Sequence, residues 1–197
     1  MVTLEDLLPK IQGRLSMMEL YTLAITLTTS VLQLSPTPWL DSLVCKRDIA
    51  FLRANDRSYT SVDLHHPYLI HRHSLGTSGG GDERRRANDC SNLLALAIML
   101  LEINSARHIE TLHCTEDFGP NCEVTELTDL SAARRWLGEQ KNRGNVSCAF
   151  FSAIAYCLQS FVNPQALLRD QKFCKAVEEQ VLAPLEEEMR FLLLGDM

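Results

Sequence analysis

Four histidines gather in the segment HHPYLIHRH, residues 65–73, and they are the first side chains that could do chemistry. Imidazole is a common zinc ligand, so this His-rich loop could serve a metal-dependent enzyme. Zinc ligands usually come in two tight pairs, however, and no paired cysteines stand beside the loop. A second group, His113, Cys114 and Cys122, supplies possible ligands without a fourth in register. We therefore expect a polar loop and packed thiols with no metal or other cofactor, and we keep a metal-dependent enzyme as the alternative.

Nucleophilic catalysis has no recognisable setting in this sequence. There is no G-x-S-x-G segment, and no cysteine stands in a signature of a cysteine protease. The seven cysteines form no C-x-x-C pair, and an odd number in a chain of 197 residues is typical of free thiols in a reducing compartment.

Charge and hydropathy exclude two further classes of partner. The net charge of −6 argues against non-specific nucleic-acid binding, which needs a basic field, and the short basic run at residues 84–86 is typical of a solvated loop. The longest strictly apolar run, residues 93–101, is far shorter than the roughly 18–20 residues that span a bilayer. We expect a cytoplasmic protein with no nucleic-acid partner and no membrane span.

The elements that must position any site are mostly helices. Apolar residues at spacings of three and four predict a short helix and five long ones, at residues 2–13, 16–34, 91–104, 128–142, 147–161 and 170–194. The segment 91–104 is apolar on all sides, which is typical of a helix at the centre of a domain. A short strand is predicted at residues 49–52, followed by a flexible loop at about residues 53–87. The fold class is therefore mainly α, with a central buried helix and few short strands.

The stretch TPWLDSLVCKRDIAFL, residues 37–52, resembles the catalytic loop of a protein kinase. Phosphoryl transfer there needs an Asp that accepts the substrate proton and an Asn that holds a metal ion, in the pattern H-R-D-x-x-x-x-N. In this alignment Asp41 and Ser42 replace the His-Arg pair, Leu43 replaces the catalytic Asp, and Asp48 replaces the Asn. Leucine cannot accept a proton, so the resemblance implies a degenerate loop and a protein that is not an enzyme.

A second stretch, SNLLALAIMLLEI, resembles the central helix of a kinase C-lobe, S-D-V-W-S-L-G-V-I-L-Y-E-L. Leu96 and Glu102 match its Leu and Glu, while Asn92 replaces the buried Asp that braces the catalytic loop. With Trp39, which leads into that loop, these residues are assigned structural roles by the resemblance. No D-F-G, no A-P-E and no nucleotide-binding half is found, so ATP binding is not expected.

The whole pattern is similar to the fungal kinase-like C-terminal domain of unknown function that occurs in prion-like and heterokaryon-incompatibility-associated proteins. The segments that carry this similarity include LAITLTTSVLQLSPTPWL, DIAFL, HPYLI, AARRWL and FFSAIAYCLQSF. It implies a degenerate kinase-like C-lobe at residues 16–194, preceded by an N-terminal extension at residues 1–15. The expected function is a non-catalytic, pseudokinase-like interaction or regulatory module of a fungal intracellular protein, with a protein partner. A helical scaffold that needs an N-terminal partner region is a further alternative.

Overall fold

The computed structural model describes residues 1–11, 14–35, 37, 44–52, 62–70, 82–119, 122–163 and 165–195. The fold is mainly helical, as the sequence predicted. Its α-helices are α1 (Leu4–Ile11), α2 (Met17–Leu34), α3 (Asp82–Ser105), α4 (Glu126–Arg143), α5 (Cys148–Phe161), α6 (Gln171–Val177) and α7 (Ala183–Gly195). Shorter elements are the 3₁₀-helices η3 (Ile109–Thr111) and η4 (Thr115–Asp117), the π-helix η5 (Glu178–Leu182), and the strands β1 (Val2–Thr3), β2 (Ile49–Phe51) and β3 (Tyr68–Leu69).

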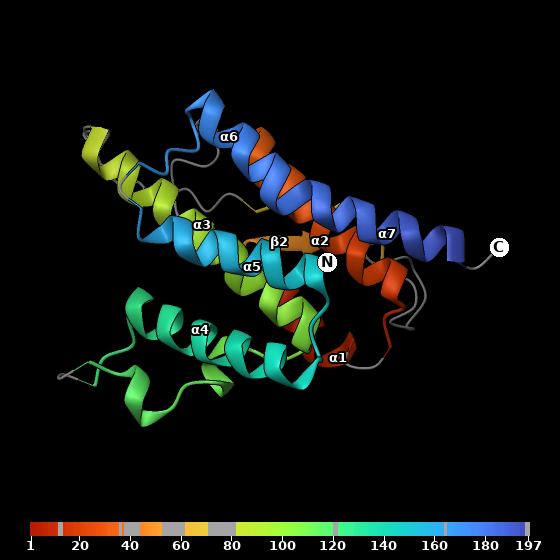
Figure 1. The fold of residues 1–197 in the computed structure, drawn as a ribbon, viewed down its shortest axis with the longest axis horizontal. Coiled ribbons are helices and arrows are strands. Elements are labelled where there is room, and N and C mark those ends of the chain that lie inside the picture. The colour runs from red at the N-terminus through yellow and green to blue at the C-terminus, as the bar shows by residue number, and fades with distance from the viewer. Residues whose placement is uncertain are drawn as a thin grey trace.

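Helix α3 lies at the centre of the fold. It runs beside α5, with α2 and α7 along one side of this pair and α4 along the other (Figure 1). Leu93, Leu96 and Leu100 are fully buried, as expected of a helix that is apolar on all sides. Within the described residues, no helix combines the length and hydropathy that crossing a bilayer requires.

The start of α3 corrects the prediction from sequence. We expected the helix to begin at Ser91, but it begins at Asp82. The added segment, DERRRAND, is polar and therefore carries no apolar period, although Glu, Arg and Ala are good helix formers. Hydrophobic spacing detects only the part of a helix that packs against a core, which is why the polar first turns were missed.

Local capping explains where the other helices begin and end. Ser16 and Glu19 form a capping box at the start of α2, with backbone-to-side-chain distances of 2.8 and 3.2 Å. Helix α4 begins after Thr125, whose hydroxyl accepts from the Thr128 amide, so the predicted start at Thr128 was slightly late. Gly144 ends α4 with φ of 68°, a left-handed conformation that suits glycine.

The last helical region consists of three successive elements, α6, η5 and α7, which share one buried apolar face. Val177, Val181 and Leu185 are fully buried, which confirms the four-residue spacing seen in the sequence. Pro184 is the second residue of α7, and the π-helix η5 ends two positions before it. Proline cannot donate to the carbonyl four residues earlier, and a π-helical turn is one way to accommodate the missing hydrogen bond.

A small antiparallel sheet joins the N-terminus to the middle of the chain. Its order is β1-β2-β3, with Val2 opposite Phe51 and Ile49 opposite Leu69. Residues 1–15, which the sequence set apart as an extension, therefore contribute a strand, and α1 adds the buried Leu4, Leu7 and Leu8. Strand β3 and the first turns of α3 fall inside the loop expected at residues 53–87. Residues 53–61 and 71–81 of that loop lie outside the described residues.

Candidate functional site

The predicted site residues divide into two groups. Trp39 and the catalytic-loop positions Asp41, Ser42 and Leu43 lie outside the described residues. The remaining predicted residues, Asp48, Asn92, Leu96 and Glu102, are described. Leu96 belongs to the apolar core, and the other three make polar contacts around one end of the loop that follows α2.

Asn92 connects this loop to the central helix. The Val44 amide donates to Asn92 Oδ1 at 3.0 Å, and Asn92 is almost completely buried. A backbone N–H in the interior needs such an acceptor, so Asn92 supports the position of the chain just after residue 43. This contact joins the backbone of the loop to the central helix.

Asp48 organises the tight turn that leads into β2. Its Oδ2 atom accepts from the Cys45 amide at 3.1 Å and from the Cys45 thiol at 2.9 Å. Burial raises the pKa of Cys45, and the hydrogen bond to the Asp48 carboxylate raises it further. The Cys45 thiol is thus held in its protonated form, which is the opposite of what a catalytic nucleophile requires.

The strongest polar cluster surrounds Glu102, near the C-terminal end of α3. The Lys46 ammonium lies 2.7 Å from Glu102 Oε1, 2.8 and 3.0 Å from the two oxygens of Glu110, and 3.4 Å from His108 Nδ1. The Ile109 amide also donates to Glu102 Oε1, at 2.7 Å. The Glu102 side chain has no exposed surface, and that of Lys46 is 11% exposed.

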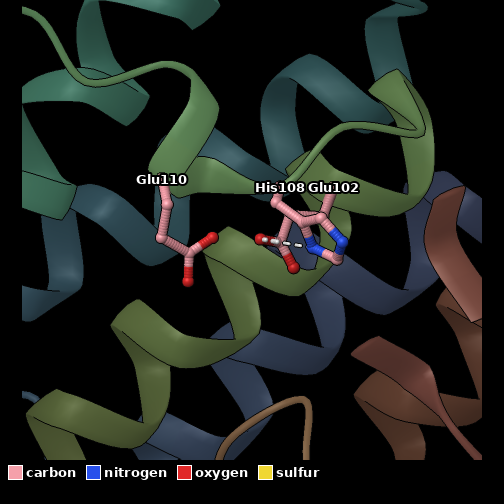
Figure 2. A group of neighbouring side chains, drawn as sticks. All are labelled: Glu102, His108 and Glu110. Atoms are coloured by element: carbon pink, nitrogen blue, oxygen red, sulfur yellow. Dashed lines mark ion pairs between the residues drawn. The ribbon is translucent and has the colours of Figure 1, made fainter. Parts of the chain in front are cut away.

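The chain reaches this arrangement through a sharp reversal after α3. Ala106 adopts φ of 50°, in the left-handed region, and η3 follows almost at once. His108 and Glu110 are thereby carried back beside Glu102, and Figure 2 shows the three side chains around a shared space. Sequence reasoning selected Glu102 but missed Lys46, His108 and Glu110. The available signal was a single charged residue in an apolar helix, because a buried carboxylate needs a cationic partner.

The charges of the cluster follow from its burial and its hydrogen bonds. Desolvation raises the pKa of Glu102, and the hydrogen bond from Lys46 only partly opposes this effect. Burial alone would lower the pKa of Lys46, but hydrogen bonds to Glu102 and Glu110 outweigh it and raise that pKa. For Glu110 the same contact with Lys46 outweighs desolvation and lowers the pKa. Lys46 therefore remains a protonated cation, unlike a catalytic lysine, whose pKa must fall before it can act as a nucleophile.

A pocket of about 160 Å³ opens beside the cluster. Apolar residues of α3 form one wall, and Glu110, Glu126 and Asp129 are among the other lining residues. Asp129 also pairs with His113, at 2.8 Å between Oδ1 and Nε2. Burial raises the pKa of Asp129, although the hydrogen bond with His113 opposes the shift. Among the described residues, the pocket is therefore mostly apolar, with one lysine and several acidic residues in its lining.

The histidines considered from sequence do not assemble a metal site among the described residues. His65 and His66 are exposed, and His66 pairs with Asp63 at 2.7 Å. His71 and His73 lie outside the described residues. The group whose ligand atoms do converge, within 4.8 Å of one another, is Glu102, His108 and Glu110.

Comparisons with known proteins identify a family and nothing closer. No curated protein and no solved structure matches this chain. One family matches residues 2–191, a range that includes the three-stranded sheet, the central helix α3 and all but the last residues of α7. Because this match spans nearly the whole chain, the chain belongs to the family described as a domain of unknown function (DUF7580).

Proposed function

We propose that this chain is a non-catalytic, pseudokinase-like interaction or regulatory module of a fungal intracellular protein. The observation that carries the proposal is that three polar residues beside the degenerate loop form hydrogen bonds or ion pairs with other groups of the protein. Lys46 is held by two glutamates, Asp48 accepts from the turn before β2, and Asn92 accepts from the Val44 amide. Side chains with these contacts support the local fold, which favours a structural role for the three residues over a catalytic one.

The order of the elements supports the kinase-like part of the proposal. A long helix, α2, precedes the loop, the short antiparallel strands β2 and β3 follow it, and the buried helix α3 comes next. The two stretches on which the resemblance rests, the loop and the central helix, thus follow each other in the fold. In the resemblance, Asn92 replaces the buried Asp that braces the loop, and Asn92 accepts a hydrogen bond from the loop backbone at Val44.

Exposed apolar residues at the end of α7 support the part of the proposal that concerns a protein partner. Phe191, Leu193 and Leu194 are 65%, 52% and 63% exposed, although they are large and apolar. Exposed apolar side chains that lie close together on one helix end are typical of surfaces that bind other proteins. The acidic residues earlier in α7, including Glu187, would favour a partner with a basic surface.

Two measurements test the proposal. The purified chain, given Mg²⁺ and ATP, should show neither phosphoryl transfer nor saturable nucleotide binding. Turnover that disappears in Asp48→Ala, with the fold intact by circular dichroism, would contradict the proposal. Cross-linking in extracts of the native host should then capture a partner that the Phe191→Asp/Leu194→Asp variant loses. Val162→Asp, which changes another exposed apolar residue, is the matched control and should retain that partner.

The alternatives make different predictions. A scaffold that needs an N-terminal partner region would unfold over a broad temperature range by itself, whereas an independent module should show one cooperative transition. A metal-dependent enzyme built on the His-rich loop requires tightly bound zinc that His65→Ala/His66→Ala removes. Both experiments use the chain alone and need no knowledge of its partner.

A further inference from the structure

We infer that Glu102, His108 and Glu110 form a binding site for a divalent transition-metal cation, which exchanges with the ammonium group of Lys46. The inference is independent of the proposed function, because a non-catalytic module and an enzyme could both bind a cation here. It also differs from the metal site considered in the His-rich loop, since it uses none of the histidines at residues 65–73.

The first argument is the set of ligand atoms. One imidazole nitrogen and two carboxylate oxygens lie within 4.8 Å of one another, and Figure 2 shows the three groups facing the same space. Zinc accepts both imidazole nitrogen and carboxylate oxygen as ligands, and sites with three protein ligands keep a fourth position open. Glu102 comes from α3 and the other two residues from the adjoining η3 region, so the short reversal after α3 assembles the set.

The second argument is a buried carboxylate oxygen that has no partner among the described residues. Among the described residues, Glu102 Oε2 has no hydrogen-bond partner, although the Glu102 side chain is fully buried. Lys46 balances the buried charge of Glu102, and Glu110 is 56% exposed, so the requirement left unmet is a partner for that oxygen. A buried polar atom without a partner is costly, and a bound cation would supply one.

Lys46 occupies the place that the metal would take. Its Nζ lies 2.7 Å from Glu102 Oε1, 2.8 Å from Glu110 Oε2 and 3.4 Å from His108 Nδ1. Zinc bonds to these atom types are about 2.0–2.2 Å long, so the metal and the ammonium group exclude each other and the ligands must close slightly. Glu110 and His108 are 56% and 25% exposed, which leaves them room to move. Lysine can keep its stem on the protein while its charge turns into water, so Lys46 can yield the position.

The test uses the full chain, freed of metal by a chelator, and Co²⁺ as a spectroscopic probe that Zn²⁺ can displace. One Co²⁺ should bind with visible absorption and without the near-ultraviolet band of thiolate ligands, which separates this site from the free cysteines. His108→Ala should weaken binding by at least about tenfold, because it removes a direct ligand, whereas the matched control His66→Ala should not. The inference is overturned if Co²⁺ binds the wild-type protein and His108→Ala with the same affinity, or if the spectrum shows thiolate ligands only.

A second variant tests the exchange with Lys46. Lys46→Met should bind the metal at least about tenfold more tightly than the wild-type protein, since no ammonium group competes. Zn²⁺ should also raise the Tm of Lys46→Met more than that of His108→Ala. If Lys46→Met binds no more tightly, Lys46 does not compete and the inference is wrong in that respect. Should Lys46→Met fail to fold, the comparison of His108→Ala with His66→Ala still decides whether the site exists, because both histidines are at least partly exposed.

Discussion

Replacing Lys46 by methionine should destabilise the fold strongly. The substitution keeps most of the apolar stem but removes the ammonium group that lies 2.7 Å from the fully buried Glu102 carboxylate. Breaking a buried ion pair by removing one partner costs about 3–5 kcal/mol, because the other charge is left uncompensated in the interior. The contact with the exposed Glu110 adds little to this figure, since water can solvate that carboxylate once Lys46 is gone.

Urea denaturation measures the effect directly. With a urea slope of about 1–3 kcal/mol per M, a loss of this size lowers the midpoint by roughly 1–5 M. The neighbouring Arg47→Met is the control, because Arg47 pairs with Glu5 at 2.8 Å but is 63% exposed. An ion pair so open to solvent contributes little, so Arg47→Met should leave the midpoint almost unchanged.

A double variant and a change of pH identify Glu102 as the cause. Lys46→Met/Glu102→Gln removes the charge but keeps an oxygen for the Ile109 amide, so it should recover much of the lost stability. Burial raises the pKa of Glu102, and without Lys46 the hydrogen bond from the Ile109 amide is the main interaction that still opposes this. A carboxyl group whose pKa is higher in the folded state favours folding when protonated, so Lys46→Met should lose stability as pH rises from 5 to 8. The reasoning fails if Lys46→Met costs no more than Arg47→Met, or if its loss is independent of pH and of Glu102→Gln.

Three further outcomes follow from burial. Leu96→Asp should abolish the cooperative melt measured by circular dichroism, because it places an unpaired charge in the core, at a cost of several kcal/mol; a native-like melt would show that α3 is not central. Asp48→Ala should remain folded and lose only about 1 kcal/mol in urea titrations, since it removes the hydrogen bonds that Asp48 accepts from the neighbouring Cys45. Iodoacetamide should modify the exposed Cys122 quickly and Cys157 only on unfolding, because burial raises the pKa of Cys157 to about 12. Rapid labelling of Cys157 in the native state, read by mass spectrometry, would contradict its placement.

The helices were predictable where the signals are local. Apolar spacing and capping residues placed α2 and α5 within one residue of their observed bounds. Both signals depend on neighbours within a few positions, so no knowledge of the tertiary structure is needed. The same reasoning missed the polar first turns of α3, which begins at Asp82, and the pairing of β1 with β2, because neither leaves an apolar period in the sequence.

The candidate site shows where local reasoning ends. The sequence by itself determined the mainly helical class, the central position of α3, and the presence of one carboxylate, Glu102, in an apolar helix. Only the tertiary structure decided which groups meet it, since Lys46 lies on a distant segment and Ala106 must reverse the chain to bring His108 near. The physical reason is that a buried charge can be recognised from its own surroundings in the sequence, whereas its partner is selected by which backbones pack together and by the cost of leaving that charge unpaired.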